Sequence, residues 1–302
     1  MSFMALQGSV ELGLIYALMA LGIFISFRIL NVADLTVDGS FTLGASCSAI
    51  ITLVGHPFLG LLAGMVAGAL AGIITAFLQT KMKIQPILAG ILTMTGLYSI
   101  NLRIMRNSPN ISLLNIPTVF DPMKKLVGNQ LAKLVLPLLI VALLITLLVL
   151  FFKTQLGLSV RATGDNEDMV RSSSINADFT KTIGLAIGNA IVALSGALIT
   201  QYQQFSEINM GIGMVVVAMA SLIIGEVLFG SKTLLQHVAA VTLGSILYRI
   251  IIAFILRANT SPSDLKLISS VIVALALSFP VIKNKLILKK IRKAGGYDAA
   301  IK

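Results

Sequence analysis

The sequence predicts an all-α integral membrane protein, and three observations lead to this prediction. Of the 302 residues, 57% are apolar and only 12% are charged, about half the charged share of an ordinary globular chain. The mean hydropathy is +0.96. Long uncharged runs recur from Gly8 to Ile282. Because so few charges cannot cover a water-exposed surface, the hydrocarbon core of a bilayer is the solvent that fits this chain.

Nine segments are long and apolar enough to cross the bilayer. A helix rises about 1.5 Å per residue, so a hydrocarbon core of about 30 Å requires about twenty mostly apolar residues. The expected spans are 9–27, 36–54, 58–80, 86–103, 132–152, 182–204, 211–229, 235–256 and 265–283. A broken or re-entrant helix would change the count, which we place between eight and ten. We expect a single transmembrane domain over 1–283 and a basic tail over 284–302.

The distribution of basic residues predicts the orientation. Cytoplasmic segments are enriched in Lys and Arg, and the end of the chain carries Lys283, Lys285, Lys289, Lys290, Arg292 and Lys293. We therefore expect a cytoplasmic carboxyl terminus and, after nine crossings, an external amino terminus. The 157–176 segment is then cytoplasmic and the proline-containing 104–131 loop is external. That loop is either a docking surface for an external partner or a simple cap.

Other functional classes find little support in the sequence. The net charge of +11 lies in clusters between apolar runs, which favours retention of cytoplasmic loops over nucleic-acid binding. His56 and His237 are far apart, and no metal-ligand spacing is present. The run GEVLFGSKT at 225–233 has an extra Ser231 before Lys232 and ends an apolar helix, unlike a phosphate-binding loop. We expect no catalytic residue, no metal and no cofactor in this chain.

Glycines recur at four-residue spacing in the third expected span. They are Gly60, Gly64, Gly68 and Gly72. Such a stripe lets two helix backbones approach closely. The spacing predicts tight helix packing, either inside one subunit or between subunits.

The polar segment 157–176 lies between two expected spans and predicts a short helix. Asp165 can cap a helix that begins near Asn166, and Glu167 and Asp168 suit the positive end of its dipole. From physical chemistry alone, such a helix is either a contact surface for a cytoplasmic protein or a solvated connector.

Three blocks of residues carry a resemblance to a known family. They are Gly157, Arg161-Ala162, Gly164, Asn166-Glu167 and Ile175-Asn176 in the polar segment, Ala33 to Ala45 with the run LTVDGSFTLGA, and Ile224 to Gly230. This pattern resembles the branched-chain amino-acid and simple-sugar permease family of ABC importers. The LTVDGSFTLGA run is similar to the subgroup associated with tryptophan and other aromatic amino acids. The chain departs from the family pattern at Asp168, Met169 and Ser174.

The resemblance implies the permease subunit of a binding-protein-dependent ABC importer in a bacterial cell membrane. An amino acid is the implied solute, with an aromatic one such as tryptophan or tyrosine favoured. The implied partners are cytoplasmic ABC ATPase subunits, which bind and hydrolyse the ATP, an external substrate-binding protein, a second permease copy in a homodimer, and membrane lipid. The expected ATPase-coupling residues are Arg161, Gly164, Asp165, Asn166, Glu167 and Asn176.

Polar residues within or beside the spans are candidates for the translocation pathway. The expected pathway residues are Asn189, Gln201, Thr95 and Asp38. An amide in hydrocarbon needs partners, which either an aqueous route or interhelical hydrogen bonds supply. For Asp34 and Asp38, the alternatives are a broken helix that turns polar backbone toward the substrate path, or a helix cap and contact with headgroup water.

An ion-gradient-driven secondary transporter is the alternative function. In that mechanism, Glu226 and Arg249 would form an intramembrane charge pair or proton relay. Both lie near the ends of expected spans, a position that weakens a relay.

Overall fold

The computed structural model describes residues 3–256 together with 267, 270, 271, 274 and 278. The chain is mainly helical in this part. The elements are α1 (Phe3–Ile23), the π-helix η1 (Phe24–Ile29), α2 (Thr36–Leu53), α3 (Pro57–Thr80), α4 (Pro86–Ile104), β1 (Asn110–Ser112), α5 (Phe120–Val127), α6 (Asn129–Phe151), α7 (Gln155–Asp165), α8 (Glu167–Ser172), α9 (Ala177–Gln203), β2 (Phe205–Glu207), α10 (Met214–Phe229) and α11 (Leu234–Leu256). Most of the ninth expected span and the whole tail lie outside the described residues.

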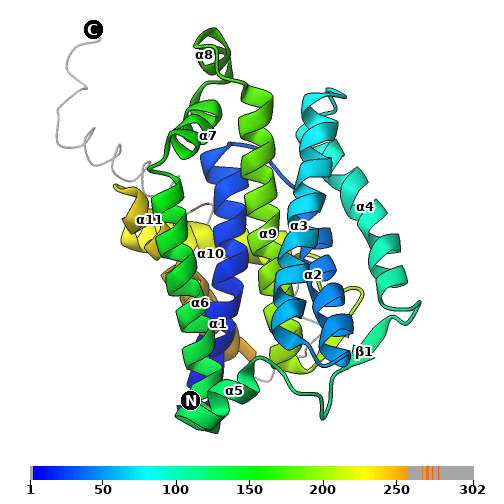
Figure 1. The fold of residues 1–302 in the computed structure, drawn as a ribbon. Helices are drawn as coiled ribbons and strands as arrows, with labels where there is room; N and C mark the ends of the chain where they lie inside the picture. Colours follow the sequence, from blue (N-terminus) through cyan, green and yellow to red (C-terminus); the bar gives the residue numbers. More distant parts are fainter. Residues whose placement is uncertain (1–2, 257–266, 268–269, 272–273, 275–277, 279–302) are drawn as a thin grey trace, which may run out of the picture.

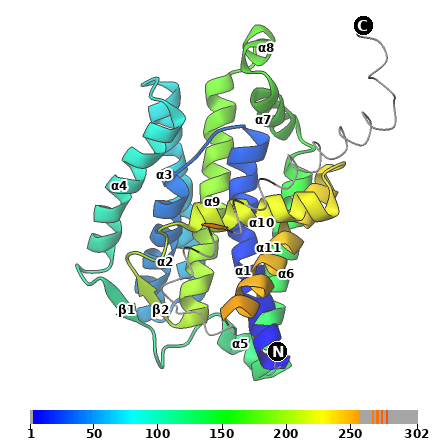
Figure 2. The same cartoon turned by 180° about the vertical axis from the view of Figure 1, so that it is seen from behind.

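The long helices form one bundle around α9 (Figure 1). This helix packs against α1, α2 and α3, while α11 packs against α1 and α10. Helices α7 and α8 lie at one end of the bundle, and the amino terminus, α5 and β1 lie at the other. Figure 2 shows the same arrangement from behind and shows that α10 runs crosswise to α1 and α9.

Among the residues that the structure describes, six helices are long and apolar enough to cross a membrane. They are Met4–Ile29, Pro57–Thr80, Pro86–Ile104, Leu131–Phe151, Ala177–Gln203 and Leu234–Ile255. The expected spans 36–54 and 211–229 also form helices, α2 and α10, but these are 18 and 16 residues long and are not among the six. The helical membrane fold is therefore confirmed, whereas the count of nine and the orientation of the termini stay predictions.

The glycine stripe of α3 packs inside the subunit. A Cβ atom on Gly60 or Gly64 would meet the backbone of α2, and one on Gly68 or Gly72 would collide with backbone carbonyls of α9. The close approach of these three helices needs the missing side chains. Of the two alternatives left open by the sequence, the structure assigns this stripe to packing within one chain.

The 104–131 segment folds over the end of the bundle that carries the amino terminus. Strands β1 and β2 pair antiparallel, with Ile111 opposite Ser206, and α5 packs against α6. The Gln201 side chain ties this segment to the bundle, because its Oε1 accepts a hydrogen bond from the amide of Val119 at 2.9 Å. The segment is thus held against the helices by both backbone and side-chain hydrogen bonds.

Candidate functional site

Helices α7 and α8 form a polar projection at one end of the bundle. Thr154 caps α7, Asn166 caps α8 by accepting from the Met169 amide at 3.0 Å, and Asn176 caps α9 by accepting from the Phe179 amide at 3.1 Å. The sequence assigned the α8 cap to Asp165, which instead ends α7. Asn166 takes this role because its extended backbone lies at the junction of the two helices.

The expected coupling residues are brought together in this projection. Arg161, Asp165, Asn166 and Asn176 are exposed, and Gly164 and Glu167 are half-buried. Glu167 accepts hydrogen bonds from Arg171 at 2.8 Å and from Lys181 of α9 at 2.5 Å. Charged side chains therefore fix α8 to the first turns of α9.

These contacts also change the acidity of Glu167. Partial burial acts to raise the pKa of its carboxyl, but the hydrogen bonds from Lys181 and Arg171 outweigh this effect and hold the pKa below the usual value. Arg171 also donates to Asp178, which lies 3.6 Å from Lys81 at the end of α3. The network therefore remains ionised at neutral pH and links α3, α8 and α9.

Gly164 seats α7 against the π-helical end of the first span. A Cβ at this position would collide with the carbonyl oxygen of Ile29. π-helical turns are uncommon and are frequently found at functional sites. The contact gives α7 a direct mechanical connection to η1.

Arg28, the residue before Ile29 in η1, continues this connection to α10. Arg28 Nε lies 2.9 Å from a carboxylate oxygen of Glu226, and the same oxygen lies 2.5 Å from Nε2 of His237 on α11. The expected pair between Glu226 and Arg249 is therefore wrong, because the Arg249 guanidinium stacks on the Tyr16 ring at 3.6 Å. The fold places Arg28 beside Glu226, a proximity that sequence spacing does not reveal.

A buried polar cluster joins α2 to the middle of α9. Asn189 donates to Asp34 at 2.7 Å and accepts from Ser40 at 2.7 Å. Asp34 also accepts from the amide of Thr36, the first residue of α2. A chain of hydroxyls then runs from Thr36 through Thr75 to Thr93, with oxygen distances of 2.7 and 3.0 Å. The buried polar side chains of this cluster are therefore hydrogen-bonded to other groups of the protein.

Asp38 caps a different helix from its own. Its carboxylate oxygens accept hydrogen bonds from the amides of Gly213 at 2.8 Å and Val215 at 2.9 Å, at the start of α10. The free amides and the dipole at a helix amino terminus stabilise such a carboxylate. The contact of Asp38 with headgroup water, one of the sequence alternatives, is replaced by these protein partners.

The other two expected pathway residues lie elsewhere. Gln201 is buried and uses its amide fully, donating to Ser48 at 3.0 Å and to the Pro57 carbonyl at 2.9 Å. Thr95 is exposed on α4 and donates within its own helix. The four expected pathway residues therefore occupy four separate places, and their role in translocation stays a prediction.

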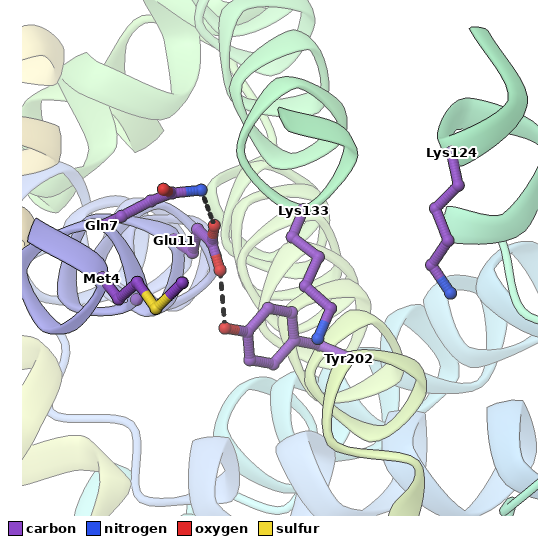
Figure 3. Close-up of a pocket in the computed structure, with 7 residues that line it drawn as sticks. Met4, Gln7, Glu11, Lys124, Lys133 and Tyr202 are labelled. Atoms are coloured by element: carbon purple, nitrogen blue, oxygen red, sulfur yellow. Dashed lines mark hydrogen bonds between the residues drawn. The ribbon is translucent and has the colours of Figure 1, made fainter. Parts of the chain in front are cut away.

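A polar cavity of about 520 Å³ lies at the end of the bundle that carries the amino terminus. Glu11, which is 4% exposed, accepts hydrogen bonds from Gln7 at 2.9 Å and from the Tyr202 hydroxyl at 2.8 Å. Figure 3 shows both contacts, with Lys133 above the Tyr202 ring and Lys124 on the far side. This carboxylate packs α1 against α9 and belongs to no cluster identified from the sequence.

A comparison with known protein families identifies the family of this chain. Residues 6–278 match the family model described as branched-chain amino acid transport system, permease component. The chain belongs to this permease family. The permease is therefore the membrane component of an ABC transporter, and the six apolar helices of its described part make it a multi-pass protein of the bacterial plasma membrane.

Two related proteins align with most of the permease sequence. The tyrosine transport system permease protein of Clostridioides difficile (strain R20291) is 40% identical over 261 residues, 86% of each chain. An uncharacterized protein of Rickettsia prowazekii (strain Madrid E), RP368, is 35% identical over 274 residues, which are 89% of the permease and 95% of the relative.

One solved structure has a similar fold. It is described as PsaBC from Streptococcus pneumoniae in complex with Fab, and the matched chain has a TM-score of 0.51 at 14% identity. The match covers 90% of the permease and 89% of that chain. At this identity the similarity concerns the fold alone.

Two residues of the site, Arg28 and Ser40, were assigned no role from the sequence. The carboxylates of Asp34 and Glu226 could have indicated that such residues exist, since a carboxylate beside a membrane span needs a hydrogen-bond donor or a cation. Which donor each one finds depends on helices that are distant in sequence. Within the described residues, no group of three or more His, Cys, Asp or Glu could hold a metal ion.

Proposed function

We propose that the permease forms the translocation pathway of a binding-protein-dependent importer for an amino acid, with tyrosine and tryptophan as the favoured solutes. The C. difficile relative, named as a tyrosine transport permease, supports the solute class. The LTVDGSFTLGA run supports an aromatic amino acid. The chain itself hydrolyses nothing, and separate ATPase subunits supply the free energy.

The α7–α8 projection is the proposed contact with the ATPase. Its exposed caps and its ion pairs form a polar surface beyond the apolar helices. The same end of the bundle also carries Lys81, Lys83 and Lys153, which favours a cytoplasmic location. In this orientation the amino terminus is external, the carboxyl terminus is cytoplasmic, and segments 211–229 and 265–283 complete nine crossings. The polar projection is the single observation that carries the proposal.

A route for transmitting the motion of α7 follows from its contacts. Gly164 presses on Ile29 in η1, Arg28 in η1 is paired with Glu226 of α10, and the other end of α10 is capped by Asp38. A displacement of α7 by the closing ATPases would therefore reach the start of α2. Such closure shifts the permease between states that differ in substrate affinity.

The exposed face of α4 is the proposed wall of the pathway. Helix α4 packs only against α2 and α3 among its principal contacts, and it is the least apolar of the six candidate spans. Its exposed residues include Thr95, Tyr98 and Ser99. Because this face of α4 carries polar groups and no other helix of the described part packs on it, contact with water is more favourable there than contact with lipid. A second permease copy in a homodimer, facing this surface, would enclose the pathway.

Site-specific cross-linking combined with transport tests the proposal. Cys47 is the chain's single cysteine, so Cys47→Ala gives a cysteine-free background. In this background, Ser173→Cys at the end of α8 should cross-link to the ATPase in reconstituted proteoliposomes. The matched variant Ser112→Cys, exposed on β1 at the opposite end, should not. Uptake of labelled tyrosine or tryptophan should require ATP, the ATPase and the binding protein.

Two outcomes would contradict the proposal. One is a cross-link from Ser112→Cys to the ATPase with none from Ser173→Cys. The other is uptake driven by a proton gradient without ATP, which would favour the secondary transporter. That alternative has lost its charge pair, because Glu226 contacts Arg28 and His237 instead of Arg249.

A further inference from the structure

A groove with a cavity of about 390 Å³ lies where α6 ends beside α7 and the start of α11. Figure 1 shows the end of α6 beside α7. Apolar side chains form most of the lining of this groove, and Thr233 and two cations, Lys153 and Arg161, complete it. The apolar residues are Val149, Phe152, Leu158, Leu234 and Leu235.

The two cations have no anionic partner among the residues that the structure describes. Neither Lys153 nor Arg161 takes part in an ion pair there, and no carboxylate lines the groove. Other cations at this end, such as Arg171 and Lys181, are paired with carboxylates. The groove therefore presents uncompensated positive charge beside apolar surface.

The groove opens at the boundary between apolar and polar surface. Helix α6 is the least covered of the six candidate spans, because only 17% of its most apolar 18-residue stretch is buried. Leu147 and Leu150 are more than half exposed on its last turns, and Lys153 lies two residues beyond its end. Lipid acyl chains would contact those leucines, and lipid head groups would lie at the level of Lys153.

We propose that this groove binds an acidic phospholipid, whose phosphate lies between Lys153 and Arg161 and whose acyl chains follow α6. Basic pockets between membrane helices bind anionic head groups in this way. The chain's own tail does not provide the anion, since residues 284–302 hold six basic residues and the single acid Asp298. Because Arg161 belongs to α7, the bound lipid would stabilise the seat of the coupling helices.

The absence of tryptophan from the sequence provides a direct test. The variant Leu158→Trp places one fluorophore in the groove at a position that is 51% exposed. The purified full-length variant is reconstituted in vesicles of phosphatidylcholine that contain brominated phosphatidylglycerol or brominated phosphatidylcholine, which quench tryptophan on contact. We expect the phosphatidylglycerol to be preferred about tenfold, as two basic residues near the surface allow.

A second fluorophore and two pairs of charge variants make the result specific. Leu143→Trp, 61% exposed on the middle of α6, should report no preference between the two lipids. Adding Lys153→Gln and Arg161→Gln to Leu158→Trp should abolish the preference. Adding Lys83→Gln and Arg106→Gln removes the same charge from exposed sites outside the groove and should leave the preference intact.

Four results would overturn the inference. Three of them are equal quenching by both lipids at position 158, a preference that survives removal of Lys153 and Arg161, and a preference of the same size at position 143. A groove covered by protein would give little quenching by either lipid and would also refute it. The measurement needs no ATPase, so its outcome is independent of the proposed transport function.

Discussion

Carboxylates in two regions of the permease find their partners in different ways. At the α7–α8 projection, Glu167 and Asp178 are paired with cations on partly exposed side chains. In the interior, Asp34 and Asp38 accept from neutral donors, namely backbone amides and the Asn189 side chain. Water and salt screen the first set, whereas nothing replaces a lost donor in the second. The comparison indicates an adjustable contact surface supported by a rigid interior.

The largest expected effect comes from breaking the interior cluster at Asn189. The variant Asn189→Leu deprives buried Asp34 and Ser40 of a partner, and this should destabilise the permease by about 3 kcal/mol. Thermal unfolding of the purified protein in detergent would measure the loss. Thr95→Val, which removes a hydroxyl bonded only within exposed α4, serves as control and should stay within about 0.5 kcal/mol of wild type. Equal stability of both variants would show that the interior is not rigid.

The variant Gly164→Val tests the contact between the projection and η1. The added side chain collides with the Ile29 carbonyl, so α7 must move away from η1. We expect ATP-dependent uptake to fall at least tenfold, while the protein still inserts and purifies. Gly8→Ala, with open space around it on α1, is the matched control and should retain uptake.

A smaller effect is expected at Asp38. Asp38→Asn keeps the shape of the side chain but replaces one acceptor oxygen with an amide group, so one α10 amide loses its partner. The cost should be about 1 to 2 kcal/mol in thermal unfolding. A change confined to transport, with no loss of stability, would argue that Asp38 contacts substrate, as expected of a pathway residue.

The smallest expected effect is the pH dependence of the Glu167 ion pairs. The folded-state pKa of Glu167 lies below its usual value near 4.5, so its stabilisation is present at neutral pH and is lost as the pH falls through the folded pKa. Glu167→Gln should lower the unfolding temperature slightly at neutral pH, since exposed pairs contribute about 1 kcal/mol or less. The difference from wild type should shrink below pH 4.5. A difference that persists in acid would mean that Glu167 acts through packing instead of charge.

Much of the fold could be predicted because its signals are local. Apolar runs about twenty residues long led to the helical membrane fold, and the four-residue glycine spacing led to tight packing of α3. The polar 157–176 segment was recognised as an exposed helical insert, although its two helices and the Asn166 cap were not. Segments 36–54 and 211–229 were expected as spans and form helices α2 and α10, but the later start of α10 and its crosswise course were not foreseen.

The sequence by itself determined that this chain is a helical membrane protein of a permease family, because composition and short motifs carry that information without any knowledge of contacts. Only the tertiary structure decided that Arg28 faces Glu226, that Asp38 caps α10 and that Asn189 bridges to Asp34. These partners are separated by between 155 and 198 positions in the chain. Each polar group in an apolar medium must find a donor or acceptor, but which one it finds is set by the way distant helices pack.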